Sequence, residues 1–199
     1  MTLPLPLTLP GVATTVTPGP APTVRGLDFS LTSTGVAGNT GWADTLKPPA
    51  KLRGHDRMAW LLERVADHCR GVDLVVVEGP SYGNQGAQRQ SGHHERAGLW
   101  WMATHALWKA GIPVAVAPPA SVKKFATGSG NAAKDAMVLA AARRFPWFDG
   151  DNNACDALWL CAAGAAWLGV PMVDLPKAQL TALDGIDWPG GIEPLERAA

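Results

Sequence analysis

One segment decides the fold: Val24-Arg-Gly-Leu-Asp-Phe-Ser-Leu-Thr-Ser-Thr-Gly-Val-Ala37, which predicts a strand, a tight polar turn and a second strand. The turn residues Thr32-Ser-Thr-Gly35 are of the types that hairpin connections favour. Asp28 ends the first strand, which is mostly apolar. A carboxylate there is costly to bury unless a cation or a hydrogen-bonding partner offsets its charge. If Asp28 binds a metal, other carboxylates should stand at strand or helix ends, as Glu78 and Asp156 do.

The composition indicates one medium-sized domain. The chain has 199 residues, of which 47% are hydrophobic, and this is ample for a core. The formal net charge is zero, so the protein as a whole has no electrostatic attraction to nucleic acid or membranes. A polyanion would have to be bound by a local basic patch or through metal ions. No apolar run approaches the roughly 20 residues that a membrane span needs, so no membrane partner is expected.

The two ends of the chain are predicted to lie outside the domain. Residues 1–22 are rich in proline and are expected to form a flexible leader, while residues 170–199 are expected to form an extended tail. The leader has no basic start before an apolar run, so it does not resemble a secretory signal. Cys69, Cys155 and Cys161 show no paired spacing, which favours a reducing compartment. We therefore expect a cytoplasmic protein.

Between these ends, strands are followed by alternating strands and helices. Residues 24–29, 35–38 and 41–46 predict an antiparallel meander, and residues 73–78 and 112–117 predict two buried strands. Helices are predicted over 56–69, 87–110, 132–144 and 152–168, and a loop over 118–131. This order predicts an α/β fold with a mixed five-stranded sheet and helices on both faces.

Four segments in this order resemble the ribonuclease H-like nuclease superfamily and, within it, the RuvC-like Holliday junction resolvases. The matching segments are Gly26–Gly35, Leu74–Glu78, Ala117–Lys124 continuing into Thr127–Lys134, and Asn153–Leu158. The resemblance covers a domain at residues 23–169. It implies a metal-dependent endonuclease that cuts four-way junctions or other branched DNA. The compact core with unusual tails favours a phage or prophage source.

The resemblance also implies a metal site. Phosphodiester hydrolysis by two Mg²⁺ ions about 4 Å apart, with Mn²⁺ as a possible substitute, requires convergent carboxylates. Asp28 would bridge the ions, while Glu78 and Asp156 would each hold one. The family commonly has an acidic residue or a histidine three positions before the helix aspartate, where this chain has Asn153. Its amide oxygen can ligate a metal without contributing charge. Asp151 is either a fourth ligand or a helix cap.

Basic and aromatic residues near these carboxylates are expected to bind DNA. Lys134 matches a lysine that the family places near the scissile phosphate, and Lys123 and Lys124 would complete a local basic patch. Gly128, Ser129 and Gly130 would present backbone amides to a phosphate. Tyr82 lies where related resolvases carry an aromatic wedge that stacks on an unpaired base.

Alternatives remain open at this stage. Asp28, Glu78, Asp156, Lys134 and Tyr82 also fit plain structural roles, and His93 and His94 are expected at the surface or an interface. The helix over 87–110 corresponds to the family's dimer-forming element, which implies a homodimer. Asn153 also allows a non-catalytic protein that binds branched DNA. Actin-like phosphotransferases share the Gly-x-Asp pattern, but they need two such domains, and this chain is too short.

Overall fold

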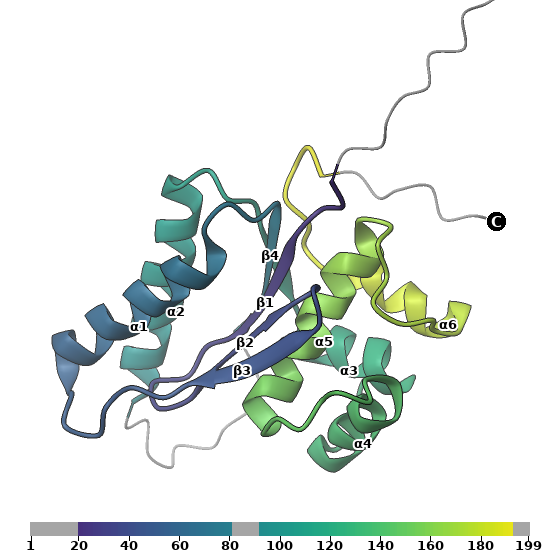
Figure 1. Cartoon of the computed structure of the whole chain (residues 1–199), viewed down its shortest axis with the longest axis horizontal. Coiled ribbons are helices and arrows are strands. Elements are labelled where there is room, and N and C mark those ends of the chain that lie inside the picture. Colours follow the sequence, from purple (N-terminus) through teal and green to yellow (C-terminus); the bar gives the residue numbers. More distant parts are fainter. Residues whose placement is uncertain (1–19, 81–91, 193–199) are drawn as a thin grey trace, which may run out of the picture.

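The computed structural model describes residues 20–80 and 92–192, which form a five-stranded sheet covered by helices (Figure 1). The strands are β1 (Val24–Asp28), β2 (Thr34–Gly38), β3 (Trp42–Leu46), β4 (Leu74–Glu78) and β5 (Val114–Ala117), in the order β3-β2-β1-β4-β5. β1, β2 and β3 pair antiparallel, whereas β1, β4 and β5 pair parallel. The predicted mixed sheet is therefore confirmed.

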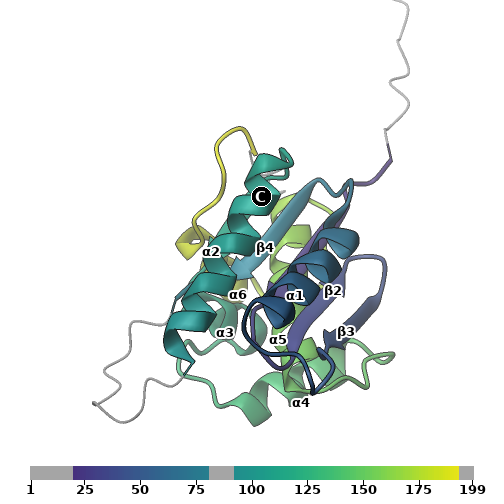
Figure 2. The ribbon, with the colours of Figure 1, turned by 90° about the vertical axis from the view of Figure 1, so that its left-hand side faces the viewer.

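Helices cover both faces of the sheet. Figure 2 shows α1 (Gly54–Cys69) and α2 (His93–Lys109) lying side by side in front of it. The opposite face carries α3 (Pro119–Thr127), α4 (Lys134–Arg144), α5 (Asn152–Trp167) and α6 (Lys177–Leu180), followed by the 3₁₀ turn Thr181–Gly185. Within the described residues, no helix combines the length and hydropathy that crossing a bilayer requires.

The alternation of side chains along the strands divides the core into two layers. Leu74 and Val76 of β4 belong to the cluster that contains α5, whereas Val75 and Val77 belong to the cluster that contains residues of α1 and α2. Successive side chains of a strand point to opposite faces. Glu78 therefore follows Leu74 and Val76 onto the α5 face, and the same alternation from Val24 through Gly26 directs Asp28 there.

Two glycines allow α5 to lie directly on the strands. A Cβ atom at Gly26 of β1 would overlap the carbonyl oxygen of Ala157, and one at Gly35 of β2 would overlap the carbonyl oxygen of Asn153. Gly35 is also the residue that pairs with Asp28 across the antiparallel ladder. The first turn of α5 is thereby brought next to the end of β1.

Two parts of the sequence prediction were wrong. Residues 118–131 were expected to be a loop, but α3 forms over Pro119–Thr127, because proline suits a first helical turn and Val122, Phe125 and Ala126 supply a buried face. The tail is not extended over residues 177–185, which are helical and bury Gln179 and Leu183. Asp187 then forms an antiparallel bridge with Val116.

Some predictions fall outside the described residues. These are the leader as far as residue 19, the first residues of the helix predicted over 87–110, and the last residues of the tail. The described part of the leader is held at the sheet, because Asn39 donates a hydrogen bond from Nδ2 to the carbonyl oxygen of Pro22 at 2.9 Å.

We expect Gly35→Ala to lower the free energy of unfolding by about 1–3 kcal/mol, because the added methyl group forces α5 away from β2. Urea unfolding measures this change. Gly98→Ala is the matched control: its Cβ meets open space in α2, so stability should stay constant or rise by about 0.5–1 kcal/mol. A Gly35→Ala variant as stable as the unmodified chain would show that the close packing is not needed.

Candidate active site

Asp28 and Glu78 stand at the carboxyl ends of two neighbouring parallel strands. Leu27 of β1 pairs with Val77 of β4, so the next residue of each strand is a carboxylate. Parallel strands end at the same edge of a sheet, which places both acids at one position in the fold. Among the described residues, neither carboxylate accepts a hydrogen bond from another side chain.

Asp156 reaches the same place from the first turns of α5. Its carboxylate forms an ion pair with Lys134 of α4, with 3.3 Å between Oδ2 and Nζ. The Asp156 side chain is 20% exposed, whereas that of Lys134 is 64% exposed. The acid is thus held in the fold, while the lysine reaches it from the surface.

The pKa values show that the three acids are electrostatically coupled. Burial and the charge of Asp156 raise the pKa of Asp28 from 3.8 to about 6, although Lys134 opposes this shift. Burial and the charges of Asp28 and Asp156 raise the pKa of Glu78 from 4.5 to about 7. Burial also raises the pKa of Asp156, against the effect of Lys134. Desolvation and like charge both disfavour the ionised acids, so a nearby cation would stabilise them.

Two of the three predicted lysines act on this cluster. The charges of Lys134 and Lys123 both lower the pKa values of Glu78 and Asp156. Attraction to Asp156 in turn raises the pKa of Lys134. Lys124, the next residue of α3, is exposed and contributes to none of these shifts. The structure therefore brings Lys123 and Lys134, but not Lys124, into the electrostatic field of the acids.

The types of donor in this cluster fit a hard divalent cation. Carboxylate oxygens are the ligands that Mg²⁺ prefers, and Mg²⁺ needs few of them because it retains water. In the present arrangement, Lys134 supplies the positive charge beside Asp156. Over residues 20–80 and 92–192, no three His, Cys, Asp or Glu side chains are grouped closely enough to hold one metal ion.

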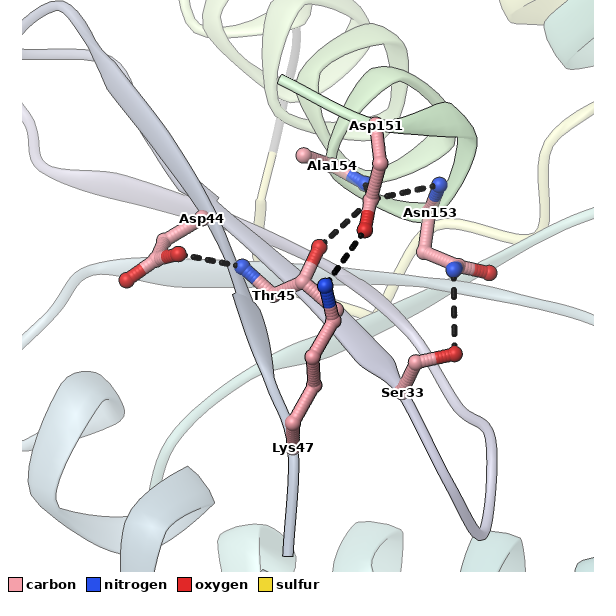
Figure 3. A network of polar contacts seen from close by, with 7 residues as sticks. All are labelled: Ser33, Asp44, Thr45, Lys47, Asp151, Asn153 and Ala154. Carbon is pink, nitrogen blue, oxygen red and sulfur yellow. Dashed lines mark hydrogen bonds and ion pairs between the residues drawn. The ribbon is translucent and has the colours of Figure 1, made fainter.

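Asp151 is the N-cap of α5 and faces β3. Its Oδ1 accepts hydrogen bonds from the amides of Asn153 and Ala154 at 3.1 Å each, and from Thr45 Oγ1 at 2.6 Å. Oδ2 lies 3.2 Å from Lys47 Nζ (Figure 3). Burial alone would raise the pKa of Asp151, but these partners hold it below its ordinary value. Of its two predicted roles, the structure shows the cap, and a metal ligand would have to leave these partners.

Asn153 directs its amide nitrogen toward the β1–β2 turn. Nδ2 donates a hydrogen bond to Ser33 Oγ at 3.0 Å (Figure 3). This bond fixes the turn that follows Asp28 to the helix that carries Asp156. The amide oxygen is not used in this contact, so a role for Asn153 as a neutral ligand stays a prediction.

The loop between α3 and α4 uses part of its backbone internally. The Gly128 amide donates to the carbonyl oxygen of Lys124 at 2.8 Å, and the Ser129 amide donates to Thr127 Oγ1 at 3.2 Å. Gly128 has a positive φ of 87° and ends α3, which explains why a glycine stands there. Phosphate binding by Gly128, Ser129 and Gly130 stays a prediction, with two of the three amides already engaged. Tyr82 lies outside the described residues.

The structure adds two exposed residues that the sequence interpretation did not assign to the site. His93 and Arg96 of α2 line a cavity of about 230 Å³ together with Asp28 and Glu78. The signal was present in the sequence, since His93, Arg96, Ala97 and Trp100 recur at the spacing of one helical face. Only the fold shows that this face looks toward the ends of β1 and β4.

We predict that Glu78→Gln stabilises the fold in a pH-dependent way when no divalent cation is present. Because the folded state binds the Glu78 proton more tightly than the unfolded chain does, stability falls as pH rises from about 4.5 to about 7. The neutral amide should raise the free energy of unfolding by on the order of 1–3 kcal/mol at about pH 8 and change it little at about pH 4.

Urea unfolding with EDTA at both pH values measures this effect. Asp174→Asn, at an exposed position, is the control and should leave stability constant at both. If Glu78→Gln changes the free energy of unfolding equally at the two pH values, the electrostatic explanation is ruled out.

The cap gives a second prediction. Asp151→Ala removes the acceptor for two helix amides and should lower the free energy of unfolding by about 1 kcal/mol, whereas Asp151→Asn keeps a capping oxygen and should lose less. Thermal unfolding of the two variants side by side makes this comparison. If alanine is tolerated as well as asparagine, the cap does not stabilise α5.

Comparison with known proteins places this geometry in a known fold. No family model matches the chain, and no curated protein does. Among solved structures, Thermus thermophilus RuvC is similar with a TM-score of 0.59 and 21% identity over 74% of this chain and 97% of that protein. T. thermophilus RuvC in complex with Holliday junction substrate is similar with a TM-score of 0.56 and 23% identity, over 74% of this chain and 96% of that one. The chain therefore has the RuvC-like, ribonuclease H-like fold that its four motifs predict.

Proposed function

We propose that this protein is a metal-dependent endonuclease that cuts branched DNA, with four-way junctions as the first candidate substrate. The observation that carries the proposal is the set of Asp28, Glu78 and Asp156 at the ends of β1 and β4: the charge of Asp156 raises the pKa of Asp28, and the charges of both raise the pKa of Glu78. A RuvC of the same fold has been solved with a Holliday junction substrate, which supports the choice of substrate.

In this proposal each residue of the cluster has one task. Asp28, Glu78 and Asp156 hold Mg²⁺ or Mn²⁺, two ions per site, with Asn153 as a neutral additional donor. When bound, the ions supply an activated water and stabilise the charge on the leaving oxygen. Lys134 is mostly exposed, so it can move from Asp156 to the scissile phosphate once the acid has another partner. Lys123 and Lys124 contact the DNA backbone beside it, and Tyr82 stacks on an unpaired base.

Cleavage of a labelled four-way junction, compared with a matched linear duplex in Mg²⁺ or Mn²⁺, tests this function. We expect paired nicks near the branch that are absent in Asp28→Asn. Mg²⁺ should also raise the melting temperature of the unmodified chain but not of Asp28→Asn, because binding to the folded state alone stabilises it. Loss of cleavage in Asp151→Asn, which keeps the cap, would assign Asp151 to the metal site.

A second candidate function is a protein that binds branched DNA without cutting it. Asn153 at the position of the family's fourth ligand favours it, since a neutral amide adds no charge to the site. Tight and selective junction binding with no nicks in either metal would establish this function and exclude the nuclease.

We further propose that the protein is a homodimer that associates through α2. The outer side of this helix exposes Trp101 and Trp108, at 68% and 71%. They line a cavity of about 490 Å³ with His105, Val114 and Val116, at the β5 edge of the sheet. An exposed apolar surface of this kind is typical of protein interfaces, and aromatic residues are enriched there. A dimer would also give a two-fold symmetric junction two active sites.

We expect Trp108→Glu to convert the dimer to a monomer, because a charge in the centre of the apolar surface opposes its burial. Size-exclusion chromatography with light scattering measures the mass. Trp147→Glu is the matched control, since Trp147 is also exposed, at 42%, but lies in the turn before α5. A monomeric unmodified chain, or a dimer that persists in Trp108→Glu, would contradict the proposal.

A further inference from the structure

One face of α2 looks into the candidate active site. His93, Arg96, Ala97 and Trp100 line the cavity of about 230 Å³ whose other wall contains Asp28 and Glu78. Their spacing of three, four and seven residues puts all four on one side of the helix. The cavity is therefore lined by two carboxylates from the ends of the strands and by an imidazole and a guanidinium from the helix.

Two contacts fix the rotation of this helix. Trp100 donates from Nε1 to the carbonyl oxygen of Glu78 at 2.9 Å, which ties α2 to the end of β4. Glu95 forms an ion pair with Arg57 of α1, with 3.0 Å between Oε2 and Nη2. Neighbouring residues on a helix point about 100° apart. With Glu95 held toward α1 and Trp100 toward β4, Arg96 is directed into the cavity.

The charge of Arg96 is not used within the described part of the chain. There its guanidinium forms no ion pair and no hydrogen bond, in contrast to that of Arg57. Arg96 is thus an exposed cation without a partner among the described residues, in the cavity at the ends of β1 and β4, and such a cation is suited to an anionic ligand at that edge of the sheet.

We propose that Arg96, with His93 one turn before it, binds a backbone phosphate of the DNA strand that lies at the carboxylates. The inference rests on the proposed function and adds residues to it. The planar guanidinium offers paired N–H donors that match a phosphate, and His93 offers a further donor. Such contacts position the strand without reading its sequence. Arg96 and His93 are thus binding residues in the same cavity as the acids, on the face of α2 that does not carry Trp101 and Trp108.

Junction binding measures the role of Arg96. We compare Arg96→Gln, Arg96→Lys and Lys109→Gln in the full-length chain, each combined with Asp28→Asn to prevent cleavage, by fluorescence anisotropy over a series of salt concentrations. Lys109→Gln is the control, since it removes one charge from the other, exposed end of α2. Arg96→Gln should weaken binding about tenfold and lower the salt slope by about 1. Arg96→Lys retains the charge, so it should keep the salt slope of the parent chain, but its affinity should lie between those of the parent and Arg96→Gln. Lys109→Gln should change neither the affinity nor the salt slope.

Junctions with a single neutral methylphosphonate near the cut separate a specific contact from general attraction. A methylphosphonate at the phosphate that Arg96 binds should weaken junction binding by the Asp28→Asn chain, which retains Arg96. The same methylphosphonate should not weaken binding further when Arg96→Gln is also present. The inference is overturned if Arg96→Gln binds as tightly as its parent, or if no single phosphate shows this non-additive effect. In both cases cleavage by the unmodified chain leaves the proposed function intact. If that chain neither binds nor cuts junctions, the proposed function falls, and this inference falls with it.

Discussion

The close contact between α5 and the glycines of β1 and β2 is the constraint on which the site depends. Any side chain at Gly26 or Gly35 would overlap the helix backbone, so the helix approaches the sheet as closely as main-chain atoms allow. The same packing continues to Gly164, where a Cβ would come within 2.6 Å of Val76. Because Gly35 pairs with Asp28, this contact brings the first turns of α5, and Asp156 with them, to the end of β1.

The cost of this arrangement is electrostatic. Burial raises the pKa values of all three carboxylates, like charge raises those of Asp28 and Glu78 further, and nearby lysines offset only part of these shifts. Such a cluster weakens the fold near neutral pH unless a cation joins it. Retaining it is therefore more easily explained by function than by stability, since buried like charges do not stabilise a domain. The ion pair between Lys134 and Asp156 shows how the chain balances this charge by itself.

Several residues of the candidate site could be located from the sequence, and the reasons are local. Asp28 and Glu78 follow apolar strands, and Asp156 lies near the start of an apolar helix, so strand and helix ends sufficed to locate them. The role of Asp151 was more difficult to predict, because a metal ligand and a helix cap at this position have the same sequence signature. Only its contacts with Thr45 and Lys47 distinguish the two roles. Arg96 and His93 were missed, because the mixed polar start of α2 does not show which side faces the sheet.

The sequence by itself determined the order of the five strands and of α1, α2, α4 and α5, the fold class and the positions of the three acids at strand and helix ends, because hydrophobic period and chain breaks are properties of neighbouring residues. Tertiary structure alone decided that residues 119–127 form a helix, that residues 177–185 pack on the core, and that Lys123 but not Lys124 acts on the acids. It also decided that Arg96 lines one cavity with Asp28 and Glu78. These outcomes depend on contacts between segments far apart in the chain, such as Trp100 with Glu78 and Glu95 with Arg57, and no local pattern encodes such contacts.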